Sequence, residues 1–149
     1  MVEIDLTRLG RSGLGEDVTG EIWLDLDGEP FPDAHWDDFI VTLLGWWTND
    51  IRALVADDAA VVTLEFMEGP YGLMLEVTAP NTWRATPTSR ASREPLPGSR
   101  VIEVAELVDS VVRAADAVLV ACRLRGWESR EISDLERRLR ELRAELRPM

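Results

Sequence analysis

The sequence predicts an α+β domain in which an antiparallel sheet of about five strands carries helices on one face. Short segments that alternate apolar and polar residues occur near the start and in the middle of the chain. One long segment between them and two segments near the C-terminal end repeat their apolar residues at helical spacing. The predicted order is β-β-α-β-β-β, with one further short strand before a C-terminal helical hairpin.

Two strands are predicted before the first helix. Residues 2–6 alternate in polarity, and a glycine-rich loop follows at residues 10–15. This loop lacks the Lys-Ser/Thr pair of a phosphate-binding loop, so we interpret it as a turn. Residues 21–27 form the second strand, with one apolar face and one face that carries acidic residues and a tryptophan. The apolar face consists of Ile22, Leu24 and Leu26, and the other face of Glu21, Trp23, Asp25 and Asp27.

A long central helix is predicted from near Asp33 to Ala56, after a turn at Asp27-Gly28. Its apolar residues fall on one stripe, which we expect to face the core. The stripe consists of Trp36, Ile40, Leu43, Leu44, Trp47, Ile51, Leu54 and Val55. Phe39, Trp46 and Asp50 lie at the edge of this stripe. Of the large side chains, Trp46 is the one whose position is least well explained by burial in the core.

The middle of the chain is predicted to form a meander of antiparallel strands. Residues 60–67 and 71–77 share an apolar face and predict a hairpin, and residues 82–86 predict the next strand. The segment 87–100 has the Pro-, Ser- and Arg-rich composition of an exposed loop. We therefore divide a single domain, residues 1–149, into an acidic part at 1–86, the loop at 87–100 and the C-terminal helices at 101–149.

The C-terminal part predicts a short strand at residues 101–104 and then two helices. Cys122 belongs to the apolar stripe of the first of these helices, which predicts a buried structural thiol. Gly126 ends that helix, and Ser129 can cap the next. The last helix has a narrow apolar seam, which either packs on the preceding helix or forms a homodimer interface. The seam consists of Ile132, Leu135, Leu139, Leu142 and Leu146.

The composition excludes several kinds of chemistry. All 16 cationic side chains are arginine, so mechanisms that use a catalytic or phosphate-binding lysine are impossible. One histidine and one cysteine cannot form a zinc site built from these two residue types alone. A site for Ca²⁺ or Mg²⁺ made of carboxylates stays open, but no metal or other cofactor is predicted. The lone cysteine and the lack of a secretory signal favour the cytoplasm, and no uncharged stretch is long enough to cross a membrane.

Negative charge is concentrated in one part of the chain. Residues 1–80 contain 17 acidic residues and three arginines, whereas residues 81–149 contain 11 acidic residues and 13 arginines. Such a field repels nucleic acid and anionic membranes and attracts a basic protein partner. The alternative is that the acidity only keeps a small domain in solution.

Three groups of residues were considered for chemistry. Glu65 and Glu76 lie on the polar face of the predicted hairpin and could form an acid–base pair. His35 could act as a base beside Asp33 or Asp37. Six acidic residues between positions 25 and 38 suggest a cation site, but their spacing does not fit an EF-hand. In each case a capping or solvated role is the simpler interpretation, so no catalytic residue is predicted.

A binding surface is the stronger prediction, because exposed tryptophans beside acidic residues are typical of protein-binding sites. The predicted partner-binding residues are Trp23, Asp25, Asp38, Phe39, Trp46 and Asp50. The alternative is that the C-terminal helices cover the second face of the sheet, which would make Trp23 part of the core.

Three segments carry a resemblance to known proteins: FPDAHWDDF at 31–39, LGWW at 44–47 and LEFMEGPY at 64–71. Through them the chain resembles small acidic actinobacterial proteins of the immunity, or antitoxin-like, type. The resemblance implies a protein without chemistry of its own that covers the active site of a basic toxin, with the helix at 36–56 and the acidic loop before it as contact surface. A small carboxylate-based enzyme or cation-binding domain, and a homo-oligomerising structural protein, remain as alternatives.

Overall fold

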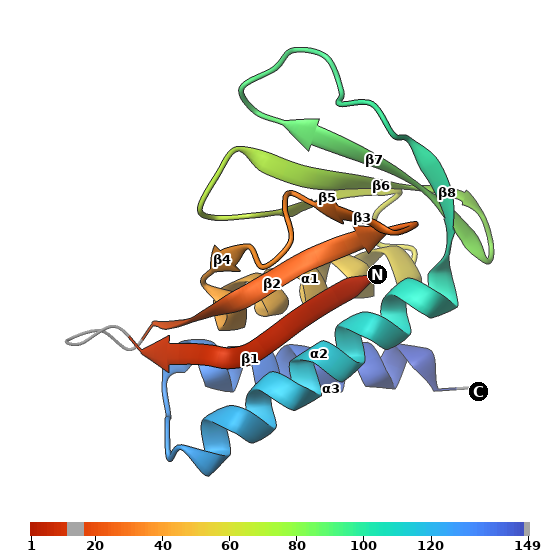
Figure 1. Cartoon of the computed structure of the whole chain (residues 1–149). Helices are drawn as coiled ribbons and strands as arrows, with labels where there is room; N and C mark the ends of the chain where they lie inside the picture. The colour runs from red at the N-terminus through yellow and green to blue at the C-terminus, as the bar shows by residue number, and fades with distance from the viewer. Residues whose placement is uncertain (12–16, 148–149) are drawn as a thin grey trace.

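A computed structural model describes residues 1–11 and 17–147 of the chain and confirms the α+β class. These residues form two antiparallel sheets of four strands each and three helices (Figure 1). The first sheet consists of β1 (Val2–Arg11), β2 (Val18–Leu26), β3 (Glu29–Phe31) and β4 (Asp37–Asp38). The second consists of β5 (Val61–Glu65), β6 (Tyr71–Ala79), β7 (Thr82–Ser89) and β8 (Arg100–Glu103). The helices are α1 (Ile40–Val55), α2 (Val104–Leu124) and α3 (Arg130–Leu146).

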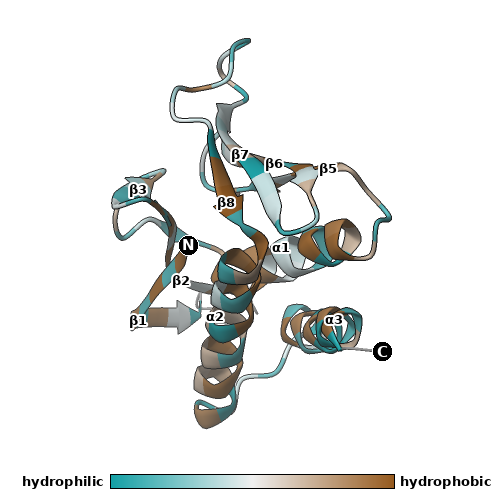
Figure 2. Ribbon diagram, turned by 90° about the vertical axis from the view of Figure 1, so that its right-hand side faces the viewer, coloured by the Kyte–Doolittle hydropathy of each residue, from teal (hydrophilic) through white to brown (hydrophobic). Residues whose placement is uncertain are grey.

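The helix α1 is central, as predicted, and packs against both sheets and both other helices. Figure 2 shows α1 and α3 nearly end on and next to each other, with α2 crossing beside them. One hydrophobic cluster contains buried side chains from both ends of the chain, from Val2 to Leu142. Cys122 lies in this cluster with no exposed surface, as predicted, and burial raises the pKa of its thiol. Among the described residues, none of the helices has the length and apolar character needed to span a membrane.

The prediction of a single sheet was wrong. Strand β2 pairs with β1 along one edge, and with both β3 and β4 along its other edge. Both edges of β2 are thus occupied, and the strands that follow α1 form a separate sheet in the order β5-β6-β7-β8. The sequence contains the apolar alternation of each strand but no signal for which edge a strand occupies.

The start of α1 was also predicted too early. The segment before Ile40 is not helical because its backbone hydrogen-bonds to β2. The carbonyl oxygen of Trp36 accepts a hydrogen bond of 2.7 Å from the N–H of Ile22, and Asp37 and Asp38 pair with β2 as strand β4. His35 adopts a left-handed backbone conformation with φ 57°, which a right-handed α-helix does not allow.

Several local predictions were confirmed. Asp27 and Gly28 both have positive φ values and form the two-residue turn that joins β2 to β3. In the second sheet, Val62 and Leu64 lie opposite Leu75 and Leu73 in the predicted hairpin. Strand β7 extends three residues further than predicted, so the exposed loop is shortened to residues 90–99.

The predicted caps of the C-terminal helices were also confirmed. Gly126 follows α2 with φ 70°. The hydroxyl of Ser129 caps α3 by accepting a hydrogen bond of 3.2 Å from the N–H of Ile132.

The apolar seam of α3 packs within the chain. Ile132, Leu135, Leu139 and Leu142 are each at most 4% exposed. They face mainly α1. The expectation that they pack mainly on α2, the preceding helix, was therefore wrong. Of the five residues proposed for a homodimer, only Leu146 is exposed. Four of the five side chains are therefore covered within one chain, which is the first of the two alternatives that the sequence left open.

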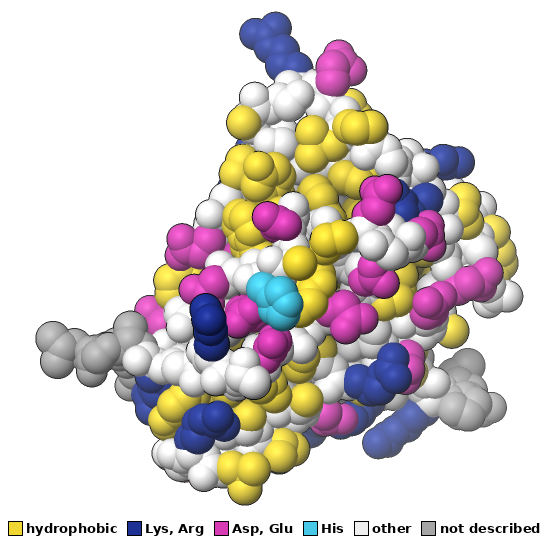
Figure 3. Space-filling view, viewed as in Figure 1, with side chains coloured by type: hydrophobic (Ala, Val, Ile, Leu, Met, Phe, Trp, Pro, Cys, Tyr) yellow, Lys and Arg dark blue, Asp and Glu magenta, His cyan; other side chains and the backbone are white. Residues whose placement is uncertain are grey.

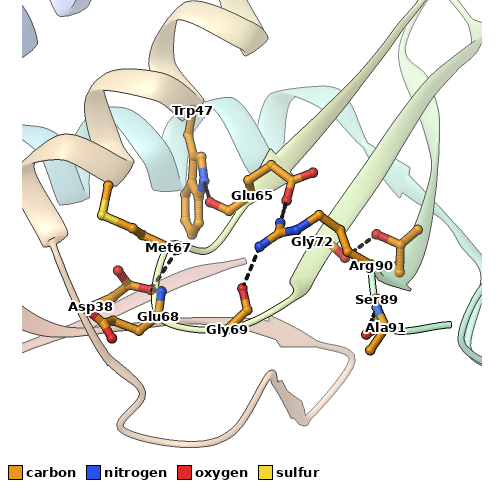
Figure 4. Close-up of polar contacts among 11 residues, drawn as sticks. Asp38, Trp47, Glu65, Met67, Glu68, Gly69, Gly72, Ser89, Arg90 and Ala91 are labelled. Atoms are coloured by element: carbon orange, nitrogen blue, oxygen red, sulfur yellow. Dashed lines mark hydrogen bonds and ion pairs between the residues drawn. The ribbon is translucent and has the colours of Figure 1, made fainter.

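The two sheets are tied together at the turn between β5 and β6 (Figure 4). The carboxylate of Asp38 accepts hydrogen bonds of 3.1 Å from the N–H groups of Met67 and Glu68. The indole N–H of Trp47 in α1 donates to the carbonyl oxygen of Glu65 at 2.8 Å. Arg90 donates to the carboxylate of Glu65 and to the carbonyl oxygen of Gly69. The turn is therefore fixed from β4, from α1 and from the segment after β7.

Candidate functional site

The outer face of the first sheet carries a row of acidic residues. Because Ile22 and Leu24 of β2 point into the core, Glu21 and Trp23 point to the other side of the sheet. In the register of the sheet, Asp5 of β1 and Asp37 of β4 lie on either side of Glu21. Residues opposite each other on neighbouring strands project to the same face, so three carboxylates form a row across three strands.

Further side chains complete this face, which we name the acidic face. Glu3 lies opposite Trp23 in the register of β1 and β2, and Asp25 follows two positions along β2. The acidic face is defined by Glu3, Asp5, Glu21, Trp23, Asp25, His35 and Asp37. Figure 3 views the molecule from this side and shows acidic side chains gathered around the histidine.

His35 lies over the row of carboxylates. Its Nδ1 is 2.7 Å from Oε1 of Glu21 and 3.7 Å from Oδ2 of Asp5. Since an ionised carboxylate only accepts hydrogen bonds, the Nδ1–H group is the donor to Glu21. The side chain of Glu21 is 9% exposed, whereas that of His35 is 60% exposed. A buried carboxylate and an exposed imidazole therefore meet at the surface.

Trp23 forms an apolar area beside this group. Its ring is tilted by 45° against the imidazole of His35, with 4.8 Å between the ring centroids. Trp23 is half-buried, so the alternative that it belongs to the core is wrong. The face therefore offers part of a rigid aromatic ring among negative charges.

Asp5 is held in its ionised form. The hydroxyl and the backbone N–H of Thr7 both donate hydrogen bonds to Oδ1 of Asp5. These bonds, with smaller contributions from His35 and Arg8, lower the pKa of Asp5 below its ordinary value. At neutral pH this carboxylate is a permanent negative charge on the acidic face.

The structure does not bring the six predicted binding residues onto one surface. Trp23 and Asp25 lie on the acidic face, while Trp46 and Asp50 lie on α1, which packs against the opposite side of the same sheet. Phe39 precedes α1 as its N-terminal cap residue and is half-buried. The prediction of one continuous surface was therefore wrong.

The prediction that Asp38 binds a partner was wrong, because this residue is only 1% exposed and cannot reach one. It lies opposite Gly20 and points inward, whereas its neighbour Asp37 points outward. Besides its two bonds to the β5–β6 turn, it accepts hydrogen bonds from the N–H of Phe39 at 2.7 Å and from the indole of Trp36 at 3.0 Å. Asp38 is a structural residue.

Trp46 lies in a different environment from Trp23. It is 39% exposed and lines a shallow pocket of about 180 Å³ between α1 and α3. The α3 residues in this pocket are Glu131, Asp134 and Arg138, so its charge is mixed. Burial raises the pKa of Asp50, one turn further along α1, to about 6, against the opposing effect of Arg138.

We expect Asp50→Asn to change how stability depends on pH. The pKa of Asp50 is about 6 in the folded chain and close to its ordinary value of 3.8 in the unfolded chain. Between these values the folded chain binds more protons, so the contribution of Asp50 to stability falls as pH rises from about 4 to about 6. Asp50→Asn should therefore match the wild type near pH 3.8 and be the more stable protein above pH 6. Urea unfolding of both proteins between pH 4 and 8 measures this, and a difference that is constant over pH would contradict it.

The residues considered for catalysis are not arranged for it. Glu65 lies opposite Gly72 and Glu76 opposite Val61, so the two glutamates are four residue steps apart along the hairpin. Four steps correspond to roughly 13 Å, which is more than the separation used by carboxylate pairs in glycosidases. His35 contacts Glu21 and Asp5 rather than the predicted Asp33 or Asp37.

The group formed by Asp5, Glu21 and His35 was missed in the sequence because its members come from three separate segments. The alternation at 2–6 and 21–27 places Asp5 and Glu21 on polar faces, but only the register of β1 and β2 puts them opposite each other. The position of His35 depends in turn on the pairing of residues 36–38 with β2.

Comparison of the chain with protein-family models, with curated proteins and with solved structures found no match.

Proposed function

We propose that the chain is a non-enzymatic protein-binding module of the immunity or inhibitor type, which presents its acidic face to a basic protein. One observation carries this proposal: the register of β1, β2 and β4 places Glu3, Asp5, Glu21 and Asp37 around Trp23 on the outer face of a sheet. The opposite face of that sheet is buried against α1, so the sheet is a rigid support for these side chains.

The acidic face combines the two features that a protein interface needs. A tryptophan in a partly desolvated position supplies an apolar anchor, and such residues contribute much of the binding energy at interfaces. The Trp23 side chain is half-buried and its ring lies against the imidazole of His35, so little side-chain entropy is lost on binding. The surrounding carboxylates select a partner with arginine or lysine side chains.

The charge of the chain also favours this face over the pocket beside Trp46. The acidic part of the sequence, residues 1–80, includes the first sheet, α1 and the β5–β6 hairpin, and it contains three arginines. Helix α3, in contrast, brings arginines such as Arg138 next to Trp46. A basic partner is attracted by the first surface, whereas the second has mixed charge.

The resemblance to immunity-type proteins makes a toxin the kind of basic partner that we propose. The contact surface that we propose for this chain differs, however, from the one that the resemblance implies. The acidic loop before α1 contributes His35 and Asp37 to the acidic face, but α1 itself packs against the opposite side of this sheet and against β5. The lone cysteine suits the reducing cytoplasm, where we propose that the protein acts.

We expect Glu3→Arg combined with Asp25→Arg to abolish capture of the partner. Both side chains flank Trp23, and reversing their charge replaces attraction by repulsion without touching the core. The measurement is capture from the native lysate at low and high salt, with wild-type and variant chains as bait. The expected result is a basic protein that the wild type retains at low salt and the variant does not.

A matched control variant has the same change in net charge at two positions outside the acidic face. Glu94→Arg with Glu145→Arg reverses two exposed glutamates, in the loop after β7 and in the last turn of α3. This control should retain the same basic protein as the wild type. Loss of the protein with both double variants would show that net charge alone causes capture, and retention by both would exclude the acidic face.

A further inference from the structure

We propose that Asp5, Glu21 and His35 form a binding site for a divalent transition-metal ion of the zinc type. One ligand atom from each residue lies within 4.8 Å of the other two. The three residues come from β1, from β2 and from the loop before β4, so the ion would connect three separate segments of the first sheet.

The two distances from Nδ1 of His35 require only small side-chain movements to accept the ion, and the ligand oxygens of Asp5 and Glu21 lie within 4.8 Å of each other. Zinc binds nitrogen and carboxylate oxygen at about 2.0–2.2 Å, so the ligand atoms of a tetrahedral site are separated by roughly 3.3–3.5 Å. The separation between Nδ1 of His35 and Oε1 of Glu21 is 2.7 Å, and that between Nδ1 and Oδ2 of Asp5 is 3.7 Å. The first has to widen and the second to shorten by less than 1 Å. The ion would take the place of the proton that Nδ1 now donates to Glu21, and the neutral ring would carry its proton on Nε2 instead.

The repulsion between the carboxylates of Asp5, Glu21 and Asp37 favours a cation beside Glu21. Like charges opposite each other on neighbouring strands repel, and here Glu21 has Asp5 on one side and Asp37 on the other. The side chain of Glu21 is nine-tenths buried, which strengthens its interaction with any nearby charge. A divalent ion neutralises two of these carboxylates, whereas protonation of His35 neutralises one.

The donor set selects the class of ion. Imidazole nitrogen is a ligand of zinc and its neighbours in the first transition row, whereas Ca²⁺ and Mg²⁺ prefer sites made of oxygen ligands. The single histidine of the chain excluded a zinc site made of histidine and cysteine alone, and two carboxylates supply the remaining ligands here. His35 is largely exposed, which leaves room for water at the fourth position.

The test is calorimetric titration of the full chain with zinc chloride at pH 7. We expect binding of one zinc ion per chain and a higher melting temperature with zinc. Titration with Mg²⁺ or Ca²⁺ should give affinities weaker by more than about tenfold. The measurement needs no partner, so the site is tested independently of the proposed docking function.

Two variants remove ligands without disturbing the core. His35→Asn keeps a residue that tolerates the left-handed backbone conformation, and Asp5→Asn keeps an acceptor for the hydrogen bonds from Thr7. Each should weaken zinc binding by at least about tenfold, because even residues that only orient ligands contribute that much. The control is Glu3→Gln, which removes one negative charge from the same strand and the same face.

Three results would overturn the proposal. Absence of zinc binding by the folded wild type would exclude the site. Equal weakening by Glu3→Gln and Asp5→Asn would show diffuse attraction to the acidic face. Unchanged affinity in His35→Asn would show that the imidazole is not a ligand.

Discussion

Asp38→Ala is expected to destabilise the fold by about 3–5 kcal/mol, which is a large part of the stability of a domain of this size. The carboxylate is buried and accepts four hydrogen bonds, from the N–H groups of Phe39, Met67 and Glu68 and from the indole of Trp36. Alanine leaves these donors without an acceptor at the point where β4, α1 and the β5–β6 turn meet. Each unsatisfied donor costs about 1–3 kcal/mol.

Urea unfolding of Asp38→Ala, Asp38→Asn and Asp37→Ala measures this effect. Asp38→Asn keeps one acceptor oxygen and should lose less stability than Asp38→Ala. Asp37 is the exposed neighbour that points to the other face, and Asp37→Ala should change stability by no more than about 0.5 kcal/mol. If Asp38→Ala and Asp37→Ala had equal effects, the four hydrogen bonds would not stabilise the junction.

Leu139→Asp is expected to destabilise the chain by about 4 kcal/mol or more and to leave its mass in solution unchanged. Leu139 is 3% exposed in the seam between α3 and α1. The substitution removes buried apolar surface and places a carboxylate without a partner in the core. Because the seam is covered within one chain, no subunit contact is lost.

Light scattering on a gel-filtration column, with urea unfolding, measures both expectations. Leu146→Asp is the matched control, since the same substitution is made in the same seam at a position that is 42% exposed. It should cost less than about 1 kcal/mol. Conversion of a wild-type dimer into a stable Leu139→Asp monomer would show that the seam joins two chains.

The secondary structure was largely predictable because it depends on local patterns. The apolar stripe of residues 40–55 and the caps at Gly126 and Ser129 specify their helices without reference to the rest of the chain. The alternation in β2 likewise specified which side chains face the core. Strands β3 and β4 were missed because they are two or three residues long and exist only through pairing with β2.

The candidate site was less predictable because it depends on tertiary pairing. Two adjacent aspartates, Asp37 and Asp38, were indistinguishable in the sequence, and pairing with Glu21 and Gly20 sends one to the surface and the other into the core. Trp23 and Trp46 both looked like exposed aromatic residues beside acids. The position of α1 behind the first sheet separates them. A pattern within one segment therefore predicts the face of a residue but not its neighbours on other segments.

The most direct measurement of the central claim is the dissociation constant of the captured basic protein, purified, with the wild type and both double variants at low and high salt. The acidic face predicts that Glu3→Arg with Asp25→Arg raises the dissociation constant by more than tenfold at low salt. The control, Glu94→Arg with Glu145→Arg, should bind like the wild type, and high salt should weaken binding of both. Equal dissociation constants for the two double variants would contradict the assignment of the binding surface to the outer face of the first sheet.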